Sequence, residues 1–358
     1  MVEILVLFGG PSPEHDVSVL TGLQAARALG RREAIYWTRS GEFTLVDASL
    51  EGSAFADGTP RGAKPLRLAS GGGFSVKAGL GREKPLGDVV VANCCHGGPG
   101  ENGALQSALD LAGVPYTGPS GAGAALGMDK LAFGALCADA GLGTLPRAAL
   151  APGVSVEFGG PYIVKPRFGG SSIGIDVVTD HATALDLLSA NRHLADGAVI
   201  EPYREGALDV NVAVRLFPEP QLSAIEKPVR GDGIYAYSEK YAGGEGMVSA
   251  PRELPAILDA AIEKDLRDQA LTAASLAGVR GVARIDFLLD GDELFLNEIN
   301  TIPGSLARHL WVEPPIPFDV LLADMVAEAA ARPTGRYSAI GADGAVLRGA
   351  GSIAAKLA

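Results

Sequence analysis

Three oxygen-bearing side chains, Asp286, Glu298 and Asn300, occur inside a run that otherwise reads as buried β-structure. The run ARIDFLLDGDELFLNEIN (283–300) predicts two strands joined at DGDE. Glu298 and Asn300 are two positions apart and share a face; Asp286 joins them if the turn holds an odd number of residues. Two carboxylates and an amide at one place suit Mg²⁺, which proteins hold with a few carboxylates plus phosphate oxygens.

The alternative for these acids is a solvated outer face, where Asp and Glu are common. Their neighbours argue against it, because Phe287, Leu288 and Leu296 make the setting apolar and Arg284 adds a cation on the same face. Burying unpaired charge costs free energy, so carboxylates in an apolar setting are expected to bind something. The sequence therefore favours a metal site here.

A second candidate is the loop KPRFGGSSIG (165–174), which offers glycines and two hydroxyls between expected strands. Backbone N–H groups in such a loop can cradle phosphate, although a plain hairpin turn explains it nearly as well. Lys130, Lys165 and Lys240 could supply positive charge to a polyphosphate, although a lone lysine is usually a surface residue. The sequence has neither a GxxxxGK[ST] loop nor a GxGxxG turn between a strand and a helix, which weakens P-loop and Rossmann readings.

Composition bounds the class of protein. A chain of 358 residues with 47% apolar residues is long enough for two or three domains. A net charge of −12 disfavours general binding to a nucleic-acid backbone but leaves room for a local basic pocket. We expect no membrane span and, from the start MVEILVLFGG, a cytoplasmic protein. Cys94, Cys95 and Cys137 form no disulfide framework, and the adjacent pair is expected to be buried as thiols.

Hydrophobic periodicity predicts the elements that position these residues. The opening strand, glycine loop and helix are typical of an α/β layer. Residues 40–84 are glycine-rich and are expected to form hairpins or a variable insertion, and the tail from Pro333 is expected to be loosely held. Strands are expected at 3–8, 88–95, 162–166, 173–178, 198–203, 209–216 and the two arms of 282–299, and helices at 17–29, 104–113, 127–142, 182–190, 254–278 and 316–332.

Several segments in order resemble the D-alanine–D-alanine ligase family of the ATP-grasp superfamily. They are LFGGPSPEHDVSV, HGGPGENGALQSALDLAGVPYTG, ALGMDK, YIVKPRFGGSSIG, VIEPY, SEKYA, ARIDF and NEINTIPGS. The resemblance implies a three-domain α/β ATP-grasp fold, in which an open parallel α/β domain precedes two α+β domains that clamp ATP. The implied boundaries are 1–127, 128–205 and 206–332, followed by a tail over 333–358.

The resemblance also implies the chemistry. The carboxylate of a first D-alanine attacks the γ-phosphate of ATP, and the amine of a second D-alanine attacks the resulting acyl phosphate. The products are D-Ala-D-Ala for peptidoglycan precursors, ADP and phosphate. The implied cofactors are ATP and two Mg²⁺ ions, with Mn²⁺ as a substitute. The implied partners are small-molecule substrates, with no nucleic acid or membrane, and the implied state is a homodimer.

Individual residues take roles from the same resemblance. Glu14 would grip the ammonium of the first substrate, Tyr241 would sit on a lid near Glu14 and Ser171, and Arg284 with the Gly304 N–H would stabilise the oxyanion. Taken alone, Glu14 could instead be a helix N-cap and His96 a structural histidine. The full implied set is Asp286, Glu298 and Asn300 for metal; Lys130, Lys165, Ser171, Ser172, Glu201, Asp209 and Lys240 for ATP; Glu14, His96, His309 and Leu310 for substrate; and Glu14, Ser171, Tyr241, Arg284 and Gly304 for catalysis.

The chain departs from the family pattern at three places. His309, with Arg308 beside it, stands where a serine usually helps to hold the second substrate's carboxylate; Gly169 replaces a common glutamate and Pro202 a common lysine. The alternative function is therefore a related carboxylate–amine ligase with another second amino acid, in a specialised pathway. The Lys240–Tyr241 pair favours an amine nucleophile over D-lactate.

Two other classes of protein are disfavoured by the same sequence. An NAD-linked oxidoreductase would need the missing GxGxxG turn. A nucleotide-binding protein without activity would be expected to lose ligands that this chain retains.

Overall fold

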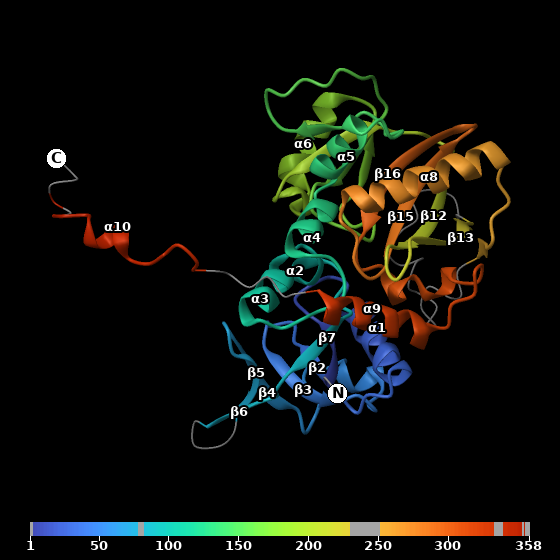
Figure 1. Ribbon diagram of the computed structural model, residues 1–358. Helices are drawn as coiled ribbons and strands as arrows, with labels where there is room; N and C mark the ends of the chain where they lie inside the picture. Colours follow the sequence, from blue (N-terminus) through green and yellow to red (C-terminus); the bar gives the residue numbers. More distant parts are fainter. Residues whose placement is uncertain (1–2, 78–81, 230–250, 333–338, 353, 355–358) are drawn as a thin grey trace.

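The computed structural model of the chain describes residues 3–77, 82–229, 251–332, 339–352 and residue 354. It has three β-sheets, of seven, four and five strands. In Figure 1 the seven-stranded sheet lies at the bottom, the four-stranded sheet lies with helix α6 (His181–Ala190) at the upper left, and the five-stranded sheet lies with helix α8 (Ala260–Leu276) at the upper right.

The N-terminal sheet is parallel at one end and antiparallel over the rest. Strand β1 pairs in parallel with β2 and β7, whereas β2 to β6 pair antiparallel in chain order. The predicted parallel pairing is thus found among β2, β1 and β7, at one end of the sheet. Residues 40–84 form hairpins, because short connections allow only antiparallel pairing. The spatial order is β6 (Glu83–Pro85), β5 (Gly73–Lys77), β4 (Lys64–Ala69), β3 (Phe43–Asp47), β2 (Glu33–Trp37), β1 (Glu3–Gly9) and β7 (Val89–Asn93).

Helices from both ends of the chain pack on this sheet. Helix α1 (His15–Ala28) is the crossover between β1 and β2, and helix α9 (Phe318–Ala331) contacts β7 and α1. Phe8 and Met325 belong to one hydrophobic cluster, so the last long helix completes the N-terminal core. The remaining helical segments of this region are η1 (Gly52–Phe55), α2 (Gly98–Glu101) and α3 (Ala104–Ala112).

The helix expected over 127–142 is two helices, α4 (Gly121–Met128) and α5 (Lys130–Asp139). Asp129 between them is extended, with φ −82° and ψ 96°, and its side chain accepts hydrogen bonds from the N–H groups of Leu131 and Ala132. An aspartate in this position is a favourable N-cap. The break therefore places Lys130 at the first position of α5.

The four-stranded sheet carries the glycine-rich loop, which joins strand β9 (Tyr162–Pro166) to strand β10 (Asp176–Val178). All its pairings are antiparallel. The hairpin expected around residues 165–174 is present, although its second strand begins only at Asp176. The spatial order is β10 (Asp176–Val178), β9 (Tyr162–Pro166), β11 (Ala198–Pro202) and β8 (Ala148–Leu150), and η3 (Arg192–Leu194) follows α6.

The five-stranded sheet buries one face under α8. Phe287 on β15 and Leu266 on α8 belong to one hydrophobic cluster. Helix α8 begins later than expected, because Asp259 caps it by accepting the N–H of Ala261. The opposite face of β15 alternates with the buried one and is partly open. The spatial order is β14 (Arg252–Glu253), β13 (Gln221–Pro228), β12 (Leu208–Arg215), β15 (Ala283–Asp290) and β16 (Glu293–Asn300).

A β-bulge sets the register of the hairpin formed by β15 and β16. Its turn is the two-residue Gly291–Asp292, not the odd turn that we required for Asp286 and Glu298 to share a face. Asp290 pairs with Glu293 and Phe287 with Leu296, but Asp286 pairs with Glu298, so Asn297 is the extra residue. The bulge supplies the odd residue that the turn lacks and brings the two carboxylates opposite each other.

The segment after α9 contains helix α10 (Ala345–Arg348), which projects away from the three sheets (Figure 1). Every helix in the described ranges is either too short or too polar to cross a membrane.

Candidate active site

One large cavity is walled by all three regions of the chain. Gly304 and Ile302 follow the end of β16, and Glu14 and Glu101 come from the N-terminal region. Most of the rest come from the two smaller sheets, the glycine-rich loop and the junction of α4 and α5. Lys240 and Tyr241 lie outside the described residues, and His96, His309 and Leu310 are not part of the cavity wall. The expected site residues that line it are Glu14, Lys130, Lys165, Ser171, Ser172, Glu201, Asp209, Arg284, Asp286, Glu298, Asn300 and Gly304.

A row of polar side chains crosses the open face of the five-stranded sheet. Glu226 on β13 pairs with Asn211 on β12, Asn211 pairs with Asp286 on β15, and Asp286 pairs with Glu298 on β16. Directly paired residues point to the same face. All four line the cavity, so its floor is this row. Neighbouring strands lie about 4.8 Å apart, which puts Glu226 about 10 Å from Asp286 along the sheet.

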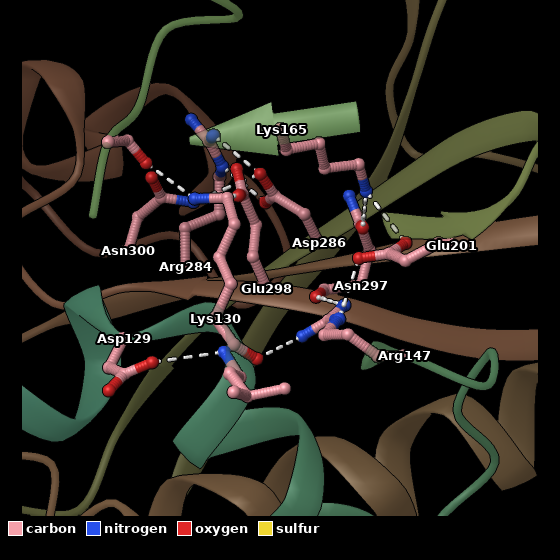
Figure 2. Close-up of polar contacts among 12 residues, drawn as sticks. Asp129, Lys130, Arg147, Lys165, Glu201, Arg284, Asp286, Asn297, Glu298 and Asn300 are labelled. Carbon is pink, nitrogen blue, oxygen red and sulfur yellow. Dashed lines mark hydrogen bonds and ion pairs between the residues drawn. The ribbon is translucent and has the colours of Figure 1, made fainter. Parts of the chain in front are cut away.

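The two carboxylates at one end of the row are held by cations (Figure 2). Arg284 donates from Nε and Nη2 to the two oxygens of Asp286, at 2.6 and 2.7 Å, and Asn300 Nδ2 donates to Asp286 Oδ2 at 3.0 Å. Lys130 Nζ lies 3.1 Å from Glu298 Oε2. Asp286, Glu298 and Asn300 therefore do converge on one spot, through the bulge rather than through the odd turn that the prediction required.

This donor set fits a metal only in company with a phosphate. Within the described ranges, no group of three or more His, Cys, Asp or Glu side chains gathers as a metal cage. Mg²⁺ usually takes one or two protein carboxylates and completes its shell with water and phosphate oxygens. Two carboxylates and one amide are what such a site requires of the protein.

A buried network, the Glu201 network, stands beside the hairpin bulge (Figure 2). It consists of Arg147, Lys165, Glu201 and Asn297. Lys165 Nζ donates to Glu201 Oε2 at 2.9 Å and to Asn297 Oδ1 at 3.0 Å, and Arg147 Nη2 donates to the Asn297 carbonyl at 3.0 Å. Arg147 Nε lies 2.6 Å from Glu201 Oε1, as an ion pair without hydrogen-bond angles.

The charge of Glu201 follows from these partners. Burial raises the pKa of its carboxyl, but the adjacent Lys165 and Arg147 outweigh burial and hold the pKa below its ordinary value. The carboxylate is thus ionised and fully enclosed. Arg147 also donates to the backbone carbonyl of Lys130, so one guanidinium joins the start of α5, the bulge and Glu201.

Next to Glu201 the cavity becomes apolar. Ile163 pairs with Glu201 across β9 and β11, and Leu288 pairs with Asp209 across β15 and β12. Ile163 and Leu288 line the cavity together with Leu145. Two carboxylates flanking an apolar slot suit a flat heterocycle that carries amino and hydroxyl groups.

The glycine-rich loop, which lines the same cavity, is held in a strained conformation. Ser171 and Ser172 both have positive φ, 55° and 57°, which non-glycine residues seldom adopt. Such strain concentrates at ligand clamps. Ser171 Oγ donates to Glu14 Oε1 at 2.5 Å and so joins the loop to the N-terminal region. Glu14 stands at the N-cap of α1 but makes no capping hydrogen bond with its side chain, which disfavours the capping alternative.

His96 and Glu101 tie the HGGPGENG loop to the segment after β16. His96 uses both ring nitrogens on protein oxygens, Ile302 O and Thr21 Oγ1, each at 2.8 Å. Burial lowers the pKa of His96 despite the nearby Glu14. Glu101 accepts the N–H groups of Gly97 and Ile302 at 2.9 Å, and burial, followed by the charge of Glu14, raises its pKa to about 7. Both residues fix the approach to Gly304.

The other end of the polar row is a second cluster of charge, the distal cluster, made of Glu226, Arg252 and His309. Arg252 Nη1 donates to Glu226 Oε1 at 2.6 Å, and His309 Nε2 lies 3.4 Å from the same oxygen. Burial raises the pKa of Glu226, but His309, Arg252 and Arg284 lower it to about 2. His309 follows a left-handed turn, Ser305 to Ala307, with φ near 50° at each residue. It lies behind Glu226, away from the cavity wall.

Four residues of this site were not predicted from the sequence. They are Arg147, Glu101, Glu226 and Arg252, and all but Glu101 stand in segments without a pattern that marks them. Glu101 had a signal, because it is part of HGGPGENG. The bulge also left a signal in the sequence. Leu294 and Leu296 alternate, but the next apolar residue is Ile299 instead of position 298, so the alternation slips by one residue near Asn297.

These features define an ATP-grasp fold: two sheet domains that face each other across one cavity, with a glycine-rich loop above and carboxylates on the floor. Comparison with known proteins is more specific. The family model described as D-ala D-ala ligase N-terminus matches residues 3–119, and that described as D-ala D-ala ligase C-terminus matches residues 142–327. The chain belongs to the D-alanine–D-alanine ligase family.

Individual relatives agree with this assignment. The D-alanine–D-alanine ligase of Mycolicibacterium smegmatis is 34% identical over 93% of this chain and 96% of its own length, and that of Bradyrhizobium sp. (strain ORS 278) is 31% identical over 92% and 96%. The crystal structure of the Helicobacter pylori ligase superposes with a TM-score of 0.73, at 26% identity, over 93% of this chain and 100% of that chain. The VanG D-Ala:D-Ser ligase of Enterococcus faecalis, at 24% identity and a TM-score of 0.74 over 92% and 99% of the two chains, shares the fold.

Proposed function

We propose that this chain joins two D-alanines in an ATP-dependent reaction that gives D-Ala-D-Ala, ADP and phosphate. The observation that carries the proposal is the floor of the cavity, where Asp286, Glu298 and Asn300 converge beside Lys130. A phosphoryl group transferred there would meet paired cations and metal-type ligands. Such transfer depends almost entirely on positioning and on stabilisation of charge.

The nucleotide is proposed to lie between the two smaller sheets. The slot between Ile163 and Leu288 accepts the adenine, with Glu201 at its amino edge and Asp209 near the ribose. Lys130, Lys165 and the N–H groups of the strained loop at Ser171 and Ser172 then face the phosphates. Lys240 is proposed to add a further charge, but it lies outside the described residues.

Asp286, Glu298 and Asn300 would hold Mg²⁺, which supplies charge neutralisation for the transferring phosphoryl group. Arg284 donates two hydrogen bonds to Asp286 and so fixes that carboxylate's orientation. Lys130 does the same for Glu298. Two Mg²⁺ ions, replaceable by Mn²⁺, are consistent with this number of oxygen ligands.

The first amino acid is proposed to place its carboxylate near the phosphates and its ammonium near Glu14. Glu14 is already oriented by Ser171. Arg284 and the N–H of Gly304 line the same cavity and would stabilise the oxyanion of the tetrahedral intermediate. His96, together with Glu101, holds the backbone that presents Gly304, so we propose that it acts by positioning this segment. Tyr241, the remaining expected catalytic residue, lies outside the described residues.

A different second amino acid remains the alternative, because His309 lies behind Glu226 and a serine is absent from its position. Leu310 would contribute its N–H there. We further propose a cytoplasmic homodimer with small-molecule substrates only. The proposed units are residues 1–127, 128–205 and 206–332, with α9 from the third packed on the first.

The test is ADP release by the purified protein with Mg²⁺-ATP and a panel of D- and L-amino acids, singly and in pairs, with mass spectrometry of the products. D-Alanine alone is expected to give D-Ala-D-Ala. Hydrolysis of ATP without amino acids, or no turnover with any D-amino acid, contradicts the proposal. Turnover only with D-alanine plus a second compound establishes the alternative.

Glu298→Gln tests the metal assignment. We expect turnover to fall at least about 100-fold, because even changes behind metal ligands cost about 10- to 100-fold. Mn²⁺ binding in the presence of ADP should weaken in parallel, while the circular dichroism spectrum stays unchanged. Glu293→Gln, on the exposed start of the same strand, is the matched control and should leave both unchanged. A near-normal rate for Glu298→Gln would show that the metal lies elsewhere.

A further inference from the structure

The distal cluster stands at the end of the cavity floor away from the metal ligands. Glu226 is two strands away from Asp286 in register, about 10 Å at the usual strand spacing. It is 4% exposed and accepts a 2.6 Å hydrogen bond from Arg252 Nη1. Asn211 Nδ2 lies 3.4 Å from its other oxygen. A buried ion pair that faces a cavity so far from the phosphates needs an explanation of its own.

Most cations on the cavity wall have partners that place them elsewhere. Lys130 pairs with Glu298 on the proposed phosphate side, and Lys165 pairs with Glu201 on the proposed adenine side. Arg284 donates two hydrogen bonds to Asp286 in the middle of the cavity floor. Arg204 lies 3.7 Å from Asp290 and over the ring of Phe295, on the hairpin. Of the cations that line the cavity within the described residues, Arg252 is the one at the distal end.

The proposed reaction requires protein groups of opposite charge to hold its two amino acids. The first points its carboxylate at the phosphate, so its ammonium must lie away from the reacting centre, where Glu14 stands. The second points its amine at the same centre, so its carboxylate must lie away from it. An arginine is the residue best suited to grip that carboxylate, because its planar fork matches the two oxygens.

We propose that Arg252, positioned by Glu226, binds the carboxylate of the second amino acid, and that His309 is a positioning residue that supports Glu226 from behind. The inference rests on the proposed ligase function and names the chemical class of its acceptor: an amine that carries a free carboxylate. Arg252 touches the substrate, whereas Glu226 and His309 act through it.

The surroundings of His309 support this division of roles. Its side chain is 9% exposed, and its Nε2 is 3.4 Å from Glu226, longer than a good hydrogen bond. Neither ring nitrogen has a hydrogen-bond partner among the described residues. A buried polar ring of this kind is costly unless its position serves a purpose. Packed against Glu226, it keeps a polar edge beside the carboxylate that orients Arg252.

The test compares two acceptors in one reaction. D-Alanine serves as the donor, and D-alanine competes with D-alaninamide as acceptor, with mass spectrometry of D-Ala-D-Ala and D-Ala-D-alaninamide. The amide lacks the carboxylate but keeps the amine. We expect the unaltered protein to prefer D-alanine, and Arg252→Ala to lower that preference by about 10- to 100-fold, the value of a hydrogen-bonded charge. Arg252→Lys and Glu226→Gln should fall in between.

Arg267→Ala is the matched control, because Arg267 is a half-exposed arginine of α8 paired with Glu263. It should leave the preference unchanged. If Arg252→Ala slows both products equally, Arg252 is only structural and the proposal fails. If the unaltered protein uses the two acceptors equally well, the proposal fails without any variant. Absence of ADP release with any D-amino acid would instead refute the ligase function, so the two failures are distinct.

Discussion

The Glu201 network and the distal cluster both bury a glutamate beside the same cavity, yet they differ in how that charge is balanced. Each oxygen of Glu201 has its own cation, Lys165 or Arg147, within 2.9 Å. Glu226 instead receives Arg252 and His309 on a single oxygen, and the histidine lies 3.4 Å away. In the first site each carboxylate oxygen has its own cation, whereas in the second the two basic side chains share one oxygen and Asn211 is 3.4 Å from the other.

The difference matches the roles that we propose for the two sites. A slot for one invariant nucleotide benefits from groups held in a single arrangement, since precise positioning supplies much of the rate. An acceptor site can exchange one side chain for another and so change its substrate. His309, which departs from the family pattern, belongs to the distal cluster, and Arg308 adjoins it in the sequence, so we propose that both fall at the acceptor site. We therefore expect substitutions to be severe in the Glu201 network and graded in the distal cluster.

Arg147→Met should give the largest loss of stability. It removes one cation from a carboxylate that is fully buried and one donor from the bulge carbonyl of Asn297. Breaking a buried ion pair costs about 3–5 kcal/mol, and the remaining Lys165 should keep the loss near the lower end, about 3 kcal/mol. Urea unfolding followed by circular dichroism measures it.

Arg267→Met provides the comparison for that loss. Arg267 and Glu263 form a half-exposed pair one helical turn apart, which is worth about 0.3–0.5 kcal/mol. Equal losses for the two variants would mean that the Glu201 network contributes no more than a surface pair.

Local pattern predicts the elements of both sites better than it predicts their pairing. The hairpin, the glycine loop and the positions of Asp286 and Glu298 follow from periodicity, and the bulge leaves its own mark in the spacing of Leu296 and Ile299. Arg147 and Arg252 could not be found in this way. Their partners are fixed by sheet register and by contacts between segments far apart in the chain, which no local spacing encodes.

The boundaries that were wrong also have local causes. The helix expected over 127–142 is interrupted because Asp129 satisfies two backbone N–H groups of the following turn. An aspartate before a helical run is an N-cap signal, so this break was available in the sequence. The packing of α9 on the N-terminal core could not be predicted from the sequence, because the apolar face of this helix would fit any of the three sheets.

Glu226→Gln should have an effect that depends on pH. The pKa of Glu226 is lowered to about 2 by His309, Arg252 and Arg284, against the effect of burial. A lowered pKa stabilises the folded state above the ordinary value of about 4.5, and this stabilisation is lost as the pH falls toward 2. Glutamine does not titrate. The difference in unfolding free energy between the two proteins should therefore shrink by about 2 kcal/mol from pH 5 to pH 3.

Urea unfolding at both pH values measures this difference. The groups that face Glu226 are Arg252 from β14, Arg284 from β15, Asn211 from β12 and His309 from the segment after β16. A difference that stays constant between pH 5 and pH 3 would show that Glu226 is not held ionised by these partners.

His309→Ser should have the smallest effect of the three and tests the contrast most closely. Because the ring nitrogens make no hydrogen bond of good geometry with the described residues, serine removes packing but no satisfied polar contact. We expect a loss of about 1 kcal/mol in unfolding free energy. His193→Ser, on an exposed turn, should change stability by less than about 0.5 kcal/mol and serves as the control. In the acceptor competition, His309→Ser should lower the preference for D-alanine less than Arg252→Ala does, because it acts only through Glu226. A loss as large as that of Arg147→Met would mean that the distal cluster is as tightly paired as the Glu201 network, and the division between a fixed nucleotide site and an adjustable acceptor site would no longer hold.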